Sequence, residues 1–223
     1  MTQFHLKPNL LWTPNPDQPK VTAEICLEQE KICVCFDVLE NPKFFRQKCQ
    51  KDGDPCWQDS CVEVFLKTQN GYFNFELNSI GCCLAEFGVA RTPRRRFEPN
   101  EYAQIIRDIR QLPQTMPDGQ IHWSLEVKIP RKIRIFPPNT SLHPSNDSSS
   151  DSSAHNHPII AAPNLDIHLP QTVIEIPHPI SGNLYKCASC AEIPNYLSAF
   201  PIETPTPDFH RPEYFRPLIP NMR

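Results

Sequence analysis

Proline is the residue that most limits what this chain can fold into. The 223 residues include 26 prolines and only 6 glycines, and the prolines are spread along the whole length. Proline has no backbone N–H and clashes with the preceding helical turn, so it ends helices and is confined in sheets to edges, ends and turns. A helical bundle is therefore almost excluded, and short strands joined by proline-containing turns are expected.

Hydrophobic and polar side chains alternate in several segments, which is the pattern of half-buried strands. Residues 21–28 and 32–38, on either side of a turn at 29–31, predict a β-hairpin. Further strands are predicted at 61–67, 73–78, 82–87, 121–129 and 183–187. Segment 102–112 is ambiguous, because its isoleucines fit a helical stripe that has no evident cap. Many short strands predict one all-β domain over 1–223, an antiparallel β-sandwich.

Residues 137–179 differ from the rest of the chain in composition. Their middle part, residues 145–157, is rich in Ser, Asp and His and has no hydrophobic period. Such a segment cannot bury enough apolar surface to offset the entropy lost on ordering. We expect a long, disordered, low-complexity insertion within the domain, with a short strand at 172–176. Its histidines are interpreted as part of a solvated loop and not as a metal-binding tract.

The charge balance and the N-terminal sequence limit the partners and the location. The formal net charge is −3, which gives no general attraction to nucleic acid or anionic lipid. The basic cluster at Arg91 and 94–96 is interpreted as a solvated loop. No apolar run is long enough to span a membrane, and no signal peptide is evident. We expect a cytoplasmic monomer whose ten cysteines are reduced, with unconventional export left open.

Two of the predicted strands carry polar side chains on one face. Alternation places Glu63, Phe65, Asn74, Glu76 and Asn78 on the face opposite the apolar residues. If the two strands pair, two carboxylates, two carboxamides and an aromatic ring meet. Planar hydrogen-bonding groups suit neighbouring sugar hydroxyls, and an aromatic ring suits the C–H face of a pyranose. The alternative interpretation is an ordinary solvated sheet face.

Several sequence blocks occur in an order that is typical of one family. They read WQDSCVEVF, YFNFELNSIG, AEFG followed by Arg91 and Arg94, WSLEVKIP, NLYKC and PDFHRPEYF. Together they resemble a carbohydrate-binding module family 9-like domain of a short, stand-alone bacterial type. The resemblance implies a DOMON-like β-sandwich that binds mono-, oligo- or polysaccharides without catalysis, in support of carbohydrate catabolism. It requires no cofactor, although structural calcium occurs in the family.

The resemblance also assigns roles to individual residues. Trp57 is the candidate platform on which a sugar ring stacks. The candidates for holding hydroxyl groups are Glu63, Glu76, Asn78, Arg91 and Arg94. The arginines can instead pair with the carboxylates, because a guanidinium fork suits either partner.

Asp59 is the candidate calcium ligand, because it matches an acidic position of the family and calcium prefers carboxylate and carbonyl oxygens. The chain departs from the family at Ala199, where a tryptophan often follows the serine. If that tryptophan is the second wall of a sugar clamp, the clamp is altered or lost here.

Other functions compete with sugar binding. Glu63 and Glu76 on adjacent strands could meet the carboxylate spacing of a glycoside hydrolase. An open sheet face also fits a protein-interaction domain with a vestigial sugar site. Cys187 and Cys190 form a C-x-x-C that His178 or His210 could complete as a zinc site. Carbohydrate binding is favoured over all three alternatives.

Overall fold

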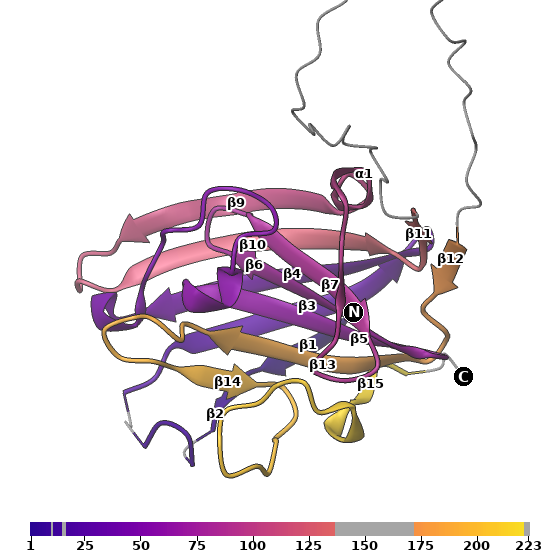
Figure 1. The fold of residues 1–223 in the computed structure, drawn as a ribbon. Helices are drawn as coiled ribbons and strands as arrows, with labels where there is room; N and C mark the ends of the chain where they lie inside the picture. Colours follow the sequence, from indigo (N-terminus) through magenta and orange to yellow (C-terminus); the bar gives the residue numbers. More distant parts are fainter. Residues whose placement is uncertain (10, 15–16, 137–171, 221–223) are drawn as a thin grey trace, which may run out of the picture.

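The computed structural model describes residues 1–9, 11–14, 17–136 and 172–220. Most of the predicted insertion at 137–179 therefore lies outside the described residues. The described part forms two antiparallel sheets packed face to face (Figure 1). This confirms the predicted all-β sandwich.

Sheet A has five strands. In spatial order they are β1 (Thr2–His5), β3 (Lys20–Glu28), β4 (Lys31–Glu40), β10 (Ile121–Pro130) and β9 (Ile106–Thr115). The hairpin predicted between residues 21 and 38 is the β3–β4 pair, and its turn places Gln29 and Glu30 at positive φ. β9 contains Pro113 and lies at the edge of the sheet, where a missing backbone donor is tolerated.

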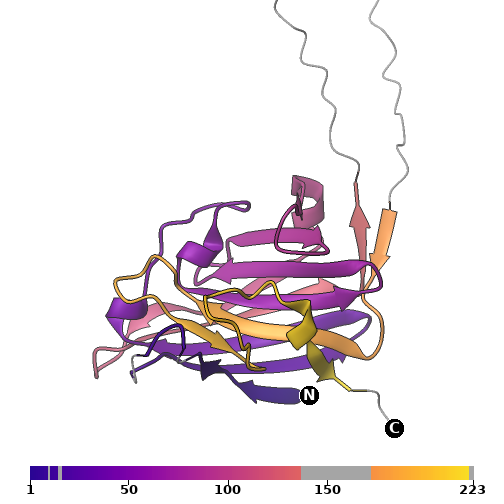
Figure 2. The same ribbon diagram turned by 60° about the horizontal axis from the view of Figure 1, so that its bottom comes forward.

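Sheet B carries the remaining long strands. Its order is β2 (Lys7–Pro8), β14 (Tyr196–Ser198), β13 (Ile180–Cys187), β5 (Cys61–Thr68), β6 (Gly71–Asn78), β7 (Cys83–Gly88) and β8 (Arg95–Arg96), with β15 (Arg216–Ile219) also pairing with β13. β11 (Lys132–Ile135) and β12 (Thr172–Glu175) form a separate two-stranded ribbon beside the sandwich (Figure 2). The short strand predicted at 172–176 is thus present.

Helical structure among the described residues is confined to short turns. They are α1 (Pro99–Tyr102) and the 3-10 turns η1 (Pro42–Phe44), η2 (Cys56–Gln58) and η3 (Pro212–Tyr214). The ambiguous segment 102–112 is mostly strand β9, in which Ile106 and Ile109 lie along the edge of sheet A. In the part of the chain that the structure describes, no helix has the length and apolar character needed to cross a membrane.

The core lies between the two sheets and is built by the predicted alternation. Val62, Val64 and Leu66 of β5 face it, as do Phe73 and Phe75 of β6, and all are fully buried. Each such side chain contributes about 1.5–3 kcal/mol on burial. Apolar packing therefore fixes which face of sheet B remains available for a site.

A buried ion pair joins the two sheets next to this core. Lys186 Nζ of β13 lies 3.0 Å from Glu40 Oε2 of β4, and neither side chain is exposed. Trp123 Nε1 donates to Glu40 Oε1 at 2.7 Å, and Ser60 donates to the same oxygen. Lys186 also donates to Asn195 Oδ1 at 3.0 Å. Removing one partner of such a pair leaves an uncompensated buried charge.

Replacing Lys186 with methionine is expected to lower the free energy of unfolding by about 3–5 kcal/mol, because Glu40 loses its cationic partner in the core. The double substitution Lys186→Met and Glu40→Gln should recover part of that loss, since the introduced amide is neutral and its oxygen still accepts from Trp123. Chemical denaturation measures the free energy of unfolding of both variants. A loss below about 1 kcal/mol in the single variant would show that the pair is not isolated from water.

Candidate functional site

The outer face of sheet B presents a row of side chains across four strands. Glu63 of β5 pairs directly with Glu76 of β6. Tyr185 of β13 lies opposite Glu63, and Leu84 of β7 lies opposite Glu76. The two strands predicted to carry the polar face are thus neighbours in register, and their two glutamates are brought side by side.

A cavity of about 290 Å³ lies over this row and is here called the sheet-face pocket. Its floor is formed by Glu63, Glu76, Leu84 and Cys187, and its aromatic walls by Trp57, Tyr196 and Phe209. Charged groups line it as well, among them Arg91, Arg96, Glu86 and Asp208. Of the sequence-predicted residues, Trp57, Glu63, Glu76 and Arg91 therefore meet in one pocket.

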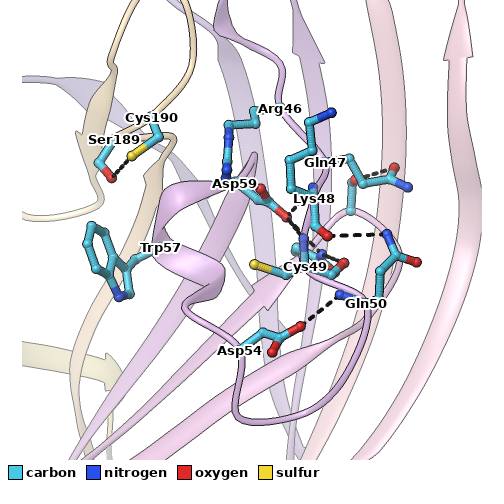
Figure 3. Close-up of polar contacts among 12 residues, drawn as sticks. Arg46, Gln47, Lys48, Cys49, Gln50, Asp54, Trp57, Asp59, Ser189 and Cys190 are labelled. Carbon is cyan, nitrogen blue, oxygen red and sulfur yellow. Dashed lines mark hydrogen bonds and ion pairs between the residues drawn. The ribbon is translucent and has the colours of Figure 1, made fainter.

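Trp57 is held at the pocket by its backbone. It lies in η2, and its carbonyl accepts from Ser189 N at 3.2 Å, while the carbonyl of Gln58 accepts from Cys190 N at 3.2 Å. Figure 3 shows its indole beside Ser189 and Cys190, apart from the polar contacts around Asp59. The side chain is 41% exposed. A large aromatic residue that is anchored by its main chain and open to solvent is available for a ligand.

The two glutamates of the floor are buried. Glu63 Oε1 accepts from the Cys187 thiol at 3.0 Å, and Glu76 Oε1 accepts from Asn74 Nδ2 at 2.9 Å. Burial raises the pKa of both carboxyls well above the usual range; the Cys187 thiol raises the pKa of Glu63 further, and Glu63 does the same to Glu76. Glu76 Oε2 is buried and has no hydrogen-bond partner among the described residues. This oxygen is a hydrogen-bond acceptor at the pocket floor that lacks a donor among the described residues.

The aromatic wall opposite the glutamates comes from the C-terminal segment. Phe209 stacks on Tyr185 with ring centroids 4.1 Å apart, and Tyr185 Oη donates to the Phe209 carbonyl at 3.2 Å. Trp12 packs against both Phe209 and Tyr196. Sequence reasoning missed Tyr196 and Phe209, although the PDFHRPEYF block contained the second of them.

His210 is a second residue of that block, and sequence reasoning considered it only for zinc. It lines the pocket, and its Nδ1 lies 2.9 Å from Tyr72 Oη. Burial, with the nearby charges of Arg94 and Arg91, lowers the pKa of His210 to about 3. The ring is therefore neutral near pH 7 and offers a hydrogen-bonding group without a charge.

Two predicted site residues, Asn78 of β6 and Arg94 of the connection before β8, do not line the pocket. Asn78 is buried, where Nδ2 donates to the Cys49 carbonyl at 3.1 Å and Oδ1 accepts from Cys82 N at 2.9 Å. Arg94 has a side chain that is 3% exposed, donates to Asn74 Oδ1 at 2.6 Å and lies over the ring of Tyr72. Both side chains are used in holding the protein together.

Asp59 is buried among hydrogen-bond donors (Figure 3). Its Oδ1 accepts from Arg46 Nη1 at 2.5 Å, and its Oδ2 accepts from Lys48 N and Cys49 N at 2.9 and 2.8 Å. Asn78 Nδ2 donates to the same Oδ2 at 3.2 Å. Calcium needs several oxygen ligands, whereas this carboxylate already has a guanidinium and three N–H partners. The groups around Asp59 do not fit calcium.

The departure at Ala199 is visible in the packing. Ala199 packs against the core, and its backbone N–H donates to the Leu184 carbonyl at 2.9 Å. The neighbouring Phe200 packs edge-on against Phe4 with centroids 5.5 Å apart. Neither residue lines the sheet-face pocket. The aromatic lining of the pocket besides Trp57 comes instead from Tyr196 and Phe209.

The C-x-x-C motif does not form the zinc site that its spacing allows. Cys187 is buried and Cys190 is exposed, and all ten cysteines are free. Among the described residues, two groups of three side chains lie close enough to hold a metal ion, and neither contains Cys190 or a histidine. These groups are Cys26–Glu28–Cys33 and Cys61–Glu63–Cys187.

Comparison with known proteins identifies the family. The sequence profile of carbohydrate-binding family 9 matches residues 2–144 and 166–219. The chain belongs to carbohydrate-binding family 9. The match omits residues 145–165, which fall inside the segment predicted as an insertion.

One solved structure supports the fold of this family 9 chain. It is the crystal structure of a protein from Bacteroides uniformis ATCC 8492 described as a candidate carbohydrate-binding protein. It is 24% identical with a TM-score of 0.63, and the alignment covers 95% of this chain and 83% of that one. No curated protein sequence matches the chain.

Replacing Asp59 with asparagine is expected to destabilise the protein by about 2–3 kcal/mol, because Arg46 loses its charged partner in a mostly buried position. Asp54→Asn, in the loop nearby, is the matched control and should lower the free energy of unfolding by less. Adding calcium should leave the melting temperature of wild type and Asp59→Asn unchanged. Calcium stabilisation of wild type that is absent from Asp59→Asn would restore Asp59 as a calcium ligand.

Proposed function

We propose that the chain binds a saccharide in the sheet-face pocket and catalyses no reaction on it. The observation that carries the proposal is the pairing of an anchored, exposed indole with a buried floor that holds an unmet carboxyl oxygen. Sugars combine apolar C–H faces with dense hydroxyl groups, so they suit a site with one aromatic wall and a few fixed polar groups. Membership of carbohydrate-binding family 9 supports the same conclusion.

In this proposal the sugar ring stacks on Trp57 and its hydroxyls reach the floor. Glu76 Oε2 takes one hydroxyl and Glu63 a second, because the two carboxyls are directly paired across β5 and β6. Arg91 lies 3.6 Å from Asp208 at the pocket and offers further hydrogen bonds. The volume of about 290 Å³ is at the small end of ligand pockets. A monosaccharide, a short oligosaccharide or the end of a polysaccharide fits better than an extended chain segment, in keeping with an accessory role in carbohydrate catabolism.

Glycoside hydrolysis is the second candidate, because directly paired residues have Cβ atoms about 4.5–5.5 Å apart, from which two carboxyl groups can reach the roughly 5–5.5 Å separation of a retaining enzyme. That chemistry needs one ionised and one protonated carboxyl. Glu63 and Glu76 share the same buried surroundings, and among the described residues no arginine or lysine bonds either carboxyl. Environments that do not separate the two groups favour binding over catalysis.

Trp57→Ala is expected to weaken saccharide binding at least about tenfold, since large aromatic anchors commonly contribute about 2 kcal/mol or more to binding. A glycan array selects the ligand, and calorimetry with that ligand measures the affinity of each variant. Leu112→Ala, an exposed apolar residue on β9 of the other sheet, is the control and should bind as wild type. Equal affinity of the folded Trp57→Ala variant and wild type would remove Trp57 from the site.

The array also separates the competing functions. Binding to a sugar class without its hydrolysis supports the proposal. Release of shortened products that requires Glu63 and Glu76 would establish the hydrolase instead. If the folded protein bound no glycan on the array, that result would contradict saccharide binding and favour a protein-interaction domain with a vestigial site.

Glu76→Ala is expected to reduce saccharide affinity about tenfold while changing stability little, because the carboxyl it removes is buried and only half satisfied. Glu101→Ala is the matched control. Glu101 is also buried, but it pairs with Arg95, accepts from Glu98 N and Phe136 N, and is not part of the pocket lining. Its loss should lower the melting temperature and leave the affinity intact. The reverse pattern in the two variants would assign Glu76 to the fold and not to the ligand.

A further inference from the structure

Two cysteines and a glutamate converge beneath the floor of the sheet-face pocket. Cys61 and Glu63 are two residues apart on β5 and share its outer face, and Cys187 of β13 lies directly opposite Cys61. The two sulfur atoms and a carboxylate oxygen lie within 4.8 Å of one another. All three residues are 3% exposed or less.

Among the described residues, no lysine or arginine forms an ion pair with these three groups. Lys186, the nearest lysine along the chain, faces the core and pairs with Glu40. Ionised thiols and carboxyls in such surroundings need a positive charge among them, and a divalent cation coordinated by all three supplies it.

The donor set and its spacing select the kind of cation. Two thiolates and one carboxylate suit zinc, whereas calcium and magnesium take oxygen ligands only. Tetrahedral zinc with bonds of about 2.0–2.3 Å holds its ligand atoms roughly 3.3–3.8 Å apart. Cys187 Sγ is already 3.0 Å from Glu63 Oε1, so side-chain adjustment within the 4.8 Å group is enough.

The position of the group gives an ion both a route of entry and a fourth ligand. Glu63 and Cys187 line the sheet-face pocket, so the cluster is reached from it. Glu76 Oε2, which is buried and has no hydrogen-bond partner among the described residues, belongs to the residue paired with Glu63 on the same floor. An oxygen ligand on the ion, either water or a hydroxyl group, has an acceptor available there.

We propose that Cys61, Glu63 and Cys187 bind a zinc ion at the base of the sheet-face pocket, with its fourth coordination position open to the pocket. This site is distinct from the Cys187-x-x-Cys190 alternative that the sequence left open, since it uses Cys61 in place of Cys190. It goes beyond the proposed saccharide binding and does not depend on it. The second cluster, Cys26–Glu28–Cys33, contains a carboxylate that is 58% exposed and therefore lacks such enclosure.

The test uses the full-length protein, stripped of metal under reducing conditions and with no sugar present. Zinc is added, excess is removed by gel filtration, and bound metal is measured by elemental analysis. Cobalt(II) then serves as a spectroscopic probe of tetrahedral thiolate coordination. One retained equivalent of zinc, with thiolate-to-cobalt charge-transfer absorption, is expected for wild type. A folded wild type that retains no zinc would overturn the proposal.

Variants assign the ligands. Cys61→Ser and Cys187→Ser should lose the bound equivalent, whereas Cys190→Ser and Cys26→Ser should keep it. Loss in Cys26→Ser with retention in Cys61→Ser would move the ion to the other cluster and overturn the proposal. Thiol labelling of wild type covers the case in which a variant fails to fold, because zinc should protect Cys61 and Cys187 selectively, as read by mass spectrometry. A Cys61–Cys187 disulfide in the reduced preparation would also overturn it.

These measurements separate the two proposals. Sugar affinity is determined with and without zinc in a separate titration. Zinc binding without any sugar affinity removes the proposed function and leaves the metal site. Sugar affinity without zinc binding removes the metal site and leaves the proposed function.

Discussion

The register between β5 and β6 is the constraint on which both the core and the pocket depend. The pairing that places Val64 opposite Phe75 in the core also places Glu63 opposite Glu76 on the outer face. A slip of one residue would exchange the two faces, and each large apolar side chain brought to the surface would cost about 1.5–3 kcal/mol. The apolar core therefore fixes the geometry of two glutamates that contribute little to stability themselves.

Strand β13 likewise has one face that stabilises the core and one face on the pocket side. Lys186 points inward, where it forms the ion pair with Glu40 that links the sheets, while Tyr185 and Cys187 face the pocket side. On the inner side, the buried charges of Lys186 and Glu40 therefore neutralise each other. On the outer side, one carboxyl oxygen has no partner among the described residues, and two thiols and a carboxyl lie together. A polar group without a partner beside a pocket is expected where a protein gives up stability for a ligand.

Local alternation in the sequence predicted the strand faces, whereas contacts between distant segments could not be predicted from it. Glu63 and Glu76 were found because strand period alone sets their face. Asn78 shares that face, but the backbone of Cys49 from the preceding loop covers it, and no period reveals such a cover. Tyr196, Phe209 and His210 were missed as pocket residues because they reach it from segments more than a hundred residues away along the chain. Segment 102–112 was ambiguous because its buried Ile105 precedes β9, and the edge strand buries its own side chains only in part.

The alanine at position 199 affects which residues form the aromatic wall of the proposed saccharide site. Because Ala199 and Phe200 pack toward the core, the aromatic lining of the pocket besides Trp57 depends on Phe209 and Tyr196. Phe209 is held by its stacking on Tyr185 and by contacts with Trp12 and Tyr196, and it lies in a segment without regular structure. Phe209 is therefore on a loop, whereas Tyr196 is on strand β14, and loops tolerate sequence change more readily than strands. In the proposed saccharide site, Phe209 is accordingly the aromatic contact most open to change, whereas the two glutamates of the floor are held in place by the register of β5 and β6.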